Sequence, residues 1–288
     1  MASIREIKNR IGSVKFTRQI TKAMKMVAAS KLRKSQNKAK PLINYSNKLN
    51  KILNNTYFYE NEKIFNFYLL KKEVKNILII VIASDRGLCG SYNSNVFRKF
   101  NNYVKDFSDK NININIISIG KKTLNFFKKK EYNLNKDYSG MWNNLNLNSI
   151  KELSDHLLSL YADNTYDKID ILYNEFKSGT LQVPVVEGFL SIPESESIKN
   201  KKEFYYEPSR FSIIEDLIKD SLKIQIYKSF LVASISEHSA RMVAMSKATE
   251  NAGDLLKDLK IVYNRSRQAA ITKEMLEIVG GAEAISDS

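Results

Sequence analysis

The sequence predicts an α/β fold combined with a long antiparallel α-helical coiled coil. In this arrangement the N- and C-terminal helices pair, and a small open parallel-sheet domain lies between them. The first observation is that all four prolines lie outside residues 1–40 and 209–288. Since a proline inside a helix costs about 3 kcal/mol, both ends of the chain can form long helices. The second is that apolar runs alternate with amphipathic stretches in between, as they do around a parallel sheet. The predicted parts are residues 1–58, 74–195 and 209–288.

The N-terminal helix, about residues 3–55, carries two apolar rows that do not share one face. The first row has the 3-4-3 spacing of a coiled-coil seam and comprises Ile4, Ile7, Ile11 and Val14. The second row comprises Ile20, Met24 and Val27. At about 100° per residue it lies nearly half a turn away from the first. One two-stranded seam cannot bury both rows, so we expect part of this helix to contact something besides the C-terminal helix.

The C-terminal segment, residues 211–279, reads as one continuous helix that would span about 100 Å at roughly 1.5 Å per residue. A stripe of mostly small side chains follows one face and would let a partner helix approach closely. It comprises Ala233, Ala240, Ala244, Ala248, Ala252, Leu255, Leu259 and Val262. A helix of this length cannot be the core of a compact globule, so it needs a partner along its length.

The middle of the chain predicts a Rossmann-like domain. Residues 75–83 form an apolar run typical of a strand that is buried on both faces. The other predicted helices cover residues 93–107, 121–130 and 150–161, and the other predicted strands cover residues 112–119, 169–176 and 180–190. This order places the two terminal helices where they can meet beside the domain.

The charge is concentrated at one end. The chain has 46 Lys and Arg against 31 Asp and Glu, and residues 1–40 hold twelve basic side chains and one acidic, or +11 of the formal +15. Such a helix could be an organelle transit peptide, an arm for nucleic acid, or a structural helix that faces an acidic protein. A merely solvated face is the fourth interpretation. The transit peptide is disfavoured because the helical pattern continues past residue 50.

Composition excludes several classes of protein. A single Cys rules out an internal disulfide framework, and with two His it leaves no sensible zinc site. The longest apolar run, residues 77–83, is far shorter than the roughly 20 residues that a membrane-spanning helix needs. We therefore expect no membrane span and no metal.

The loop at residues 84–91, SDRGLCGS, follows the predicted first strand at the end where α/β folds bind ligands. Its spacing matches neither of the common phosphate-binding glycine motifs, so a structural turn at Gly87, Cys89 and Gly90 is favoured over a nucleotide site. Cys89 could be a nucleophile, but a buried and inert thiol is the expectation. Glu237, His238 and Ser239 resemble fragments of a triad, although adjacent helical residues diverge. We expect no cofactor and no catalytic site.

Four stretches together resemble the gamma subunit of F-type ATP synthases. They are residues 4–35, IREIKNRIGSVKFTRQITKAMKMVAASKLRKS; residues 84–93, SDRGLCGSYN; residues 236–256, SEHSARMVAMSKATENAGDLL; and residues 263–285, YNRSRQAAITKEMLEIVGGAEAI. They occur in the family's order and cover about a third of the chain, whereas residues 111–164 match only by layout.

The resemblance implies a non-catalytic rotor shaft. In this family the paired helices stand inside a ring of three alpha and three beta subunits. The α/β domain lies next to the epsilon subunit and the membrane ring of c subunits. Proton flow turns the c ring and the shaft, and ATP is made on the beta subunits. The implied partners are these subunits, and nucleic acid is not among them.

The resemblance also implies roles for individual residues. The implied beta-subunit contacts are Met24, Lys25, Arg241, Gln268, Thr272 and Glu274, and the implied contacts of the foot with the c ring are Tyr205 and Glu207. Because Cys89 is the only Cys, the dithiol insertion of chloroplast members is not expected. The family's pattern begins almost at Met1, which suggests a bacterial member at the cytoplasmic face of the inner membrane, peripheral to it.

A nucleic-acid-binding coiled coil is the alternative from another class. Proteins that bind single strands add stacking aromatic side chains to their charge. Residues 1–40 contain only Phe16, which disfavours this alternative.

Overall fold

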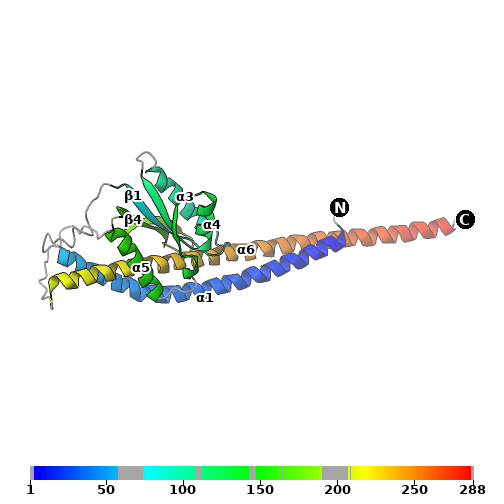
Figure 1. Ribbon diagram of the computed structural model, residues 1–288. Coiled ribbons are helices and arrows are strands. Elements are labelled where there is room, and N and C mark those ends of the chain that lie inside the picture. The colour runs from blue at the N-terminus through cyan, green and yellow to red at the C-terminus, as the bar shows by residue number, and fades with distance from the viewer. Residues whose placement is uncertain are drawn as a thin grey trace. The chain divides into compact units, whose positions relative to one another are not determined.

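The structure is a computed structural model that describes residues 3–57, 74–107, 112–142, 147–163, 165–189, 207 and 209–286. The chain divides into two compact units. The smaller unit combines Met1–Ala28 with Met242–Ser288, and the larger is Ala29–Arg241. Two helices belong to both units, because α1 runs continuously over Ile4–Tyr57 and α6 over Arg210–Ser286 (Figure 1).

Both long helices are continuous, as the sequence predicts. Helix α1 begins with a reciprocal cap, in which the Glu6 N–H donates to the Ser3 hydroxyl at 3.2 Å and the Ser3 N–H donates to the Glu6 carboxylate at 2.9 Å. Pro41 lies inside α1 without ending it, although its ring removes one backbone donor. Helix α6 is 77 residues long and contains no proline.

The two helices pair antiparallel within each unit. In the smaller unit, Lys25 Nζ donates to Ser246 Oγ at 3.0 Å, and the Thr249 hydroxyl donates to the Thr21 hydroxyl at 2.8 Å. In the larger unit, the hydroxyls of Ser35 and Ser234 lie 3.0 Å apart, and the Ser221 hydroxyl donates to the Asn50 side chain at 3.3 Å. Residue numbers that rise along α1 meet numbers that fall along α6 in both units, which confirms the predicted orientation.

Two of the three side chains in the second apolar row of α1 remain exposed. In the smaller unit, the α1 residues buried on the seam side are Ile7, Thr21 and Ala28. Ile20 and Val27 remain 43% and 57% exposed, and Met24 is half-buried. The expectation that one seam cannot bury both rows is therefore confirmed.

The α/β domain in the larger unit contains a five-stranded mixed sheet in the order β3-β2-β1-β4-β5. The strands are β1 Asn76–Ile82, β2 Asn113–Ile119, β3 Leu134–Asp137, β4 Lys168–Phe176 and β5 Gln182–Phe189. The predicted parallel pairing holds for β1 to β4, but β5 pairs antiparallel with β4. The connection between them, residues 177–181, is too short for a crossover and folds as a hairpin turn.

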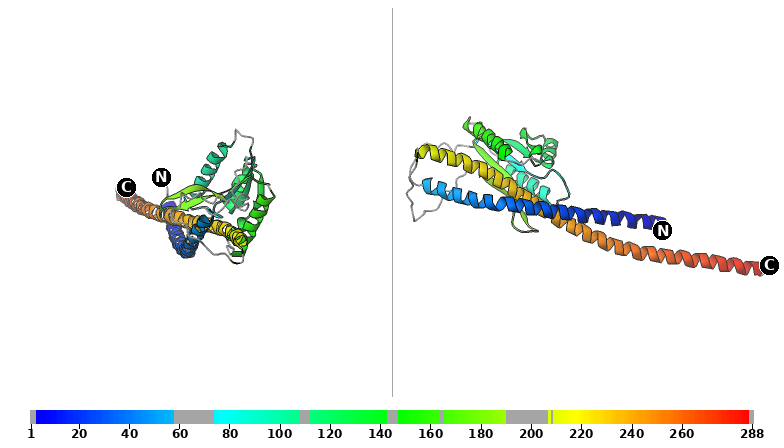
Figure 2. Two further views of the ribbon diagram at one scale, coloured as in Figure 1. Left: turned by 90° about the vertical axis from the view of Figure 1, so that its left-hand side faces the viewer. Right: turned by 90° about the horizontal axis from the view of Figure 1, so that it is seen from below.

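Helices cover both faces of this sheet (Figure 2). On one face, α3 (Tyr92–Lys105) and α4 (Lys121–Lys129) pack on the odd-numbered side chains of β1. On the other face, α5 (Leu147–Ala162) and the first part of α6 pack on the even-numbered ones, together with Leu49 and Leu53 at the end of α1. Alternate side chains of a strand point to opposite faces, so the apolar run of β1 serves both cores.

Two short elements had no signal in the sequence. The residues of β3 are Leu134, Asn135, Lys136 and Asp137, and the last three are exposed. An exposed edge strand needs no apolar alternation, so its sequence resembles a loop. A 3-10 turn, η2 (Ser139–Trp142), follows and brings Trp142 to the end of β1.

Candidate functional site

The loop after β1 lies at the carboxyl end of the sheet, where β1 separates β2 from β4. Its first residue, Ser84, is fully buried and is fixed by Asn93 at the start of α3. The Ser84 N–H donates to Asn93 Oδ1 at 3.1 Å, and Asn93 Nδ2 donates to Ser84 Oγ at 2.8 Å. The Ser84 hydroxyl is also 2.7 Å from the Arg86 carbonyl oxygen, to which it can donate. Hydrogen bonds within residues 84–93 therefore hold the loop in its conformation.

The left-handed backbone of this turn falls on Leu88, with φ of 62°, and on Gly90, with φ of 60°. Gly87, which the sequence analysis grouped with Gly90, does not have a positive φ. Leu88 holds its conformation although its side chain is 65% exposed. Left-handed backbone is costly for a leucine, so surrounding contacts must impose it.

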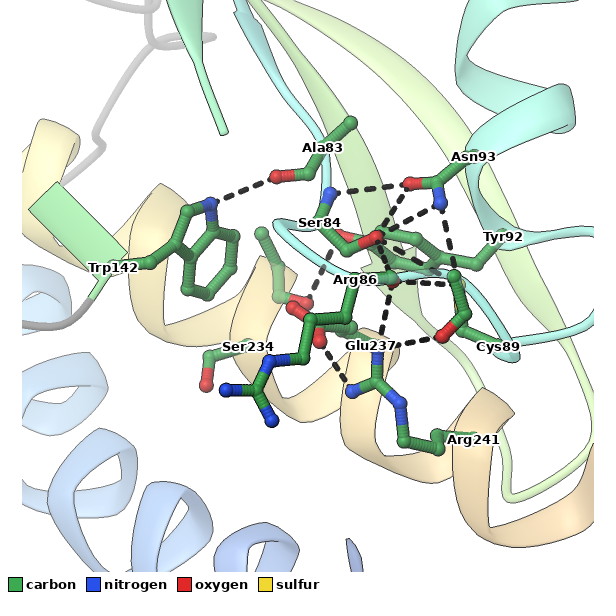
Figure 3. Close-up of polar contacts among 12 residues, drawn as sticks. Ala83, Ser84, Arg86, Cys89, Tyr92, Asn93, Trp142, Ser234, Glu237 and Arg241 are labelled. Atoms are coloured by element: carbon green, nitrogen blue, oxygen red, sulfur yellow. Dashed lines mark hydrogen bonds and ion pairs between the residues drawn. The ribbon is translucent and has the colours of Figure 1, made fainter. Parts of the chain in front are cut away.

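Helix α6 contacts the two residues that precede Leu88. Arg241 Nη2 donates to the carbonyl oxygens of Arg86 at 3.0 Å and Gly87 at 3.3 Å (Figure 3). Its Nη1 pairs with the Glu237 carboxylate one helical turn earlier, and the two side chains are only 12% and 8% exposed. One guanidinium thus joins the sheet edge to the helix and is held in place by its own buried carboxylate.

A second bond joins α6 to the start of α3. Tyr92, at the start of α3, is 1% exposed, and its hydroxyl donates to the Ala233 carbonyl oxygen of α6 at 3.1 Å. Asn174 of β4 donates to the Tyr92 carbonyl oxygen at 2.8 Å, which ties the contact to the sheet. We call the set Ser84, Arg86, Tyr92, Glu237 and Arg241 the clasp.

The pKa shifts in and beside the clasp indicate a structural role rather than a catalytic one. Burial raises the pKa of the Cys89 thiol, and burial likewise raises the pKa of Tyr92 well above its usual value. Burial raises the pKa of Glu237 more than the Arg241 guanidinium lowers it. Burial, with Arg241 and Lys31 nearby, lowers the pKa of His238 to about 4. A neutral buried thiol without a basic partner is not an activated nucleophile.

The neighbouring strand end is also filled by the chain's own atoms. Gly120 has a φ of 103°, and a Cβ added there would lie 2.2 Å from the Ala83 carbonyl oxygen. That oxygen accepts a bond from Trp142 Nε1 at 2.7 Å. The Asp85 carboxylate accepts the Lys121 N–H at 3.0 Å at the start of α4, where an anion would otherwise bind.

The residues with implied partner contacts belong to different parts of the chain. In the smaller unit, Lys25 bonds to Ser246, and Gln268, Thr272 and Glu274 are exposed on α6. Arg241 belongs to the larger unit and is engaged in the clasp. Glu207 is exposed, whereas Tyr205 lies outside the described residues.

Among the described residues, no helix pairs with α6 beyond about residue 267. Pairing in the smaller unit follows a constant register, since 25 and 246 sum to 271 and 21 and 249 sum to 270. Because α1 begins at Ile4, this register ends near residue 267. Every residue at 267–280 is exposed. The large apolar side chains exposed there are Ile271, Met275, Leu276, Ile278 and Val279. A bare apolar helix end of this kind indicates contact with another protein.

Sequence reasoning missed Tyr92 and Glu237 as members of the clasp, and it missed Asn93 as the residue that fixes Ser84. One signal was visible, since Glu237 and Arg241 have the i,i+4 spacing of a helical ion pair. The described part of the chain contains no helix long and apolar enough to cross a membrane. Within the same residues, no group of three or more His, Cys, Asp or Glu side chains could hold a metal ion.

Comparison with known proteins agrees with this architecture. The family described as ATP synthase matches residues 3–285. A relative named ATP synthase gamma chain, from Amoebophilus asiaticus, is 45% identical and spans 99% of this chain and 100% of its own length. The fold is similar to a chain of the Euglena gracilis mitochondrial ATP synthase, solved as OSCP, F1 and c-ring, with a TM-score of 0.68, 20% identity and coverage of 98% and 94%.

A second structure, titled as the rotor of the same Euglena gracilis enzyme, gives a TM-score of 0.62 at 18% identity and covers 93% of this chain and 98% of that chain. At these identities the solved structures support the fold, whereas the curated relative carries the family. From the match along the whole length, this chain belongs to the ATP synthase gamma chain family.

Proposed function

We propose that this chain is the central rotor shaft of a proton-driven rotary ATP synthase. It couples rotation of the membrane c ring to the conformational cycle of the catalytic beta subunits. The observation that carries the proposal is the antiparallel pair of α1 and α6 within each unit. Beyond this pair α6 continues with exposed apolar side chains and, in the part of the chain that the structure describes, without a partner helix. A shaft needs this combination, because the pair resists bending and the bare end can turn inside a surrounding protein.

The chain is a non-catalytic component of the complex. ATP is made on the beta subunits, and the partners of this chain are three alpha subunits, three beta subunits, the epsilon subunit and the c ring. The clasp supports the division of labour, since the sheet edge that binds ligands in other α/β folds is filled here by Arg241 and Glu237.

The contacts with the beta subunits are proposed for Met24, Lys25, Arg241, Gln268, Thr272 and Glu274. The exposed positions of Gln268, Thr272 and Glu274 support direct contact at the bare end of α6. Arg241 is already bound to the loop of Arg86 and Gly87, so we expect its effect on a partner to act through that loop. The cationic surface of α1 would guide acidic partner loops without a deep interface.

Contact with the c ring is proposed for the foot segment with Tyr205 and Glu207, and exposure of Glu207 supports it. The domain boundaries that fit this role are residues 1–58 and 209–288 for the shaft and residues 74–195 for the α/β domain. We place the protein as a peripheral subunit of a membrane-bound complex, at the cytoplasmic face of a bacterial inner membrane.

Capture from native membranes tests the proposal. Lys99 is exposed on α3, and Cys89 is 2% exposed, so Lys99→Cys offers the one readily labelled thiol for biotin among the described residues. After gentle solubilisation and a high-salt wash, the expected result is an ATP-hydrolysing assembly with one copy of this chain per three alpha and three beta subunits. Recovery of the chain alone, or with nucleic acid that salt removes, would contradict the shaft.

A further inference from the structure

A groove of 680 Å³ lies between α3 and α4 on the outer layer of the α/β domain. The ten described residues that line it include three cations, Arg98, Lys105 and Lys130, and no carboxylate. The groove lies on the face of the sheet opposite α5 and α6.

Aromatic side chains form part of the groove. The rings of Phe97 and Phe126 stack with their centroids 4.1 Å apart and an interplanar angle of 2°. Lys130 Nζ lies 5.0 Å from the Phe126 centroid and 3.5 Å from Asn101 Oδ1. The groove therefore offers an aromatic surface beside positive charge, and Asn101 and Asn102 add amides that can bond to a peptide backbone.

The surrounding layer is strongly basic. Residues 92–107 and 112–132 hold eight basic side chains and two acidic ones, Asp106 and Glu131, or a balance of +6. Some of these cations complement helix C-termini, because Lys105 lies in the last turn of α3 and Lys128 and Lys129 lie in the last turn of α4. That account does not extend to Arg98, which lies in the middle of α3.

We propose that this groove docks an acidic peptide segment that also carries an aromatic or aliphatic side chain. Its carboxylates would contact Arg98, Lys105 and Lys130, and its apolar side chain would lie against Phe97 and Phe126. Charge complementarity selects the partner, and the concave shape with an aromatic surface favours a peptide over a flat lipid surface. The inference does not depend on the shaft, since none of these residues belongs to the clasp.

Site-specific photo-crosslinking in the native complex tests the docking. Asn102 is exposed and lines the groove, so Asn102→p-benzoylphenylalanine places the reactive group within reach of the bound segment. After illumination, peptide mass spectrometry should map the adduct to a segment rich in Asp and Glu. An adduct with lipid, an adduct with a segment poor in acidic residues, or no adduct would overturn the proposal.

Charge reversal supplies the matched control. In the same background, the pair Arg98→Glu with Lys130→Glu should lower the yield of this adduct about tenfold, because attraction becomes repulsion at two rim charges. The pair Lys99→Glu with Lys128→Glu changes the net charge equally, on α3 and near the end of α4, but neither residue lines the groove. An equal loss of adduct with both pairs would mean that the net charge of this layer, and not the groove, attracts the segment, and it would overturn the proposal. Co-purification with the alpha and beta subunits checks that each variant is assembled, which keeps this test separate from that of the shaft.

Discussion

The guanidinium of Arg241 donates to the carbonyl oxygen of Arg86 at 3.0 Å, so two cationic residues meet through a backbone oxygen. The contact joins helix α6 to the loop that ends strand β1, 155 residues away in the sequence. Since α6 is one continuous helix, a force applied to the α/β domain is passed directly into it. The clasp is thus a mechanical joint in the place where related folds bind ligands.

Removal of this cation should destabilise the larger unit. Arg241→Met leaves the Glu237 carboxylate buried without its partner, which costs about 3–5 kcal/mol of unfolding free energy. Trp142 is the only tryptophan and lies against Phe230 of α6, with ring centroids 6.1 Å apart, so its fluorescence reports on this packing during urea unfolding.

Two variants make that result specific. Adding Glu237→Gln to Arg241→Met removes the unpaired charge and should recover part of the lost stability. Lys257→Met breaks the exposed pair with Asp254, whose side chains are 77% and 63% exposed, and should leave the unfolding curve unchanged. If Lys257→Met and Arg241→Met had equal effects, the clasp would have no special role.

Gly120 permits the close approach of two strand ends. In Gly120→Ala the new Cβ would meet the Ala83 carbonyl oxygen at 2.2 Å, in a backbone region that alanine avoids. We expect a loss of about 3 kcal/mol in unfolding free energy, again measured by urea unfolding. Gly140→Ala, which meets no atom within 4 Å, is the control and should behave like the natural chain.

Acid should weaken the larger unit through His238. Its pKa is lowered to about 4 in the folded chain, because burial and the cations Arg241 and Lys31 disfavour its charged form. The ordinary value for an unfolded histidine is about 6.5, so between these values the unfolded state binds more protons. The contribution of His238 to the unfolding free energy is therefore fully present above a pH of about 6.5. It falls by up to roughly 3 kcal/mol as the pH drops to about 4.

The difference between the natural chain and His238→Gln isolates this effect. Burial also lowers the pKa of His156, whereas it raises the pKa of Glu237, which opposes the loss because protonation of a buried carboxyl favours folding. Both groups remain in His238→Gln, so unfolding free energies measured from pH 7 to pH 4 should decline less steeply in that variant. Parallel declines would contradict the assigned titration.

Met24 tests the proposed contact with the beta subunits. The side chain is half-buried beside the seam, and Met24→Lys would add a charge to a helix that is already strongly basic. We expect a lower ratio of proton transport to ATP hydrolysis in membranes, with normal assembly. Met26→Lys, at a side chain that is 60% exposed on another face of α1, adds the same charge and should leave coupling intact. Equal coupling in the two variants would argue against the contact.

Local patterns predicted most of the fold, because helix length and strand burial depend on residues that are close together in the sequence. The absence of proline from residues 209–288 permitted α6, and the apolar run at residues 77–83 identified β1. Strand β3 was missed because three of its four residues are exposed and polar. The direction of β5 was predicted wrongly as parallel. It depends on the five-residue turn after β4, whereas the prediction used only the alternation of strands and helices.

The clasp depended on distant contacts that spacing cannot reveal. From the sequence, Arg241 was assigned only a partner contact, because nothing near it in the sequence shows that the carbonyl oxygens of Arg86 and Gly87 lie within reach. Tyr92 likewise read as one more residue of a quoted motif, although its hydroxyl bonds to Ala233 across 141 residues. Only the ion pair of Glu237 and Arg241 joins residues that are close in the sequence. Their spacing indicated an ion pair but not that the pair is buried.

The most direct test of the account is rotation of single molecules. A bead is attached through biotin on Lys99→Cys, with the assembled complex fixed to a surface by its beta subunits, and ATP is added. The account predicts that the bead turns in one direction and that Arg241→Met weakens the joint and lowers the torque delivered to it. ATP hydrolysis at a normal rate with a stationary bead would contradict the claim that this chain is the shaft.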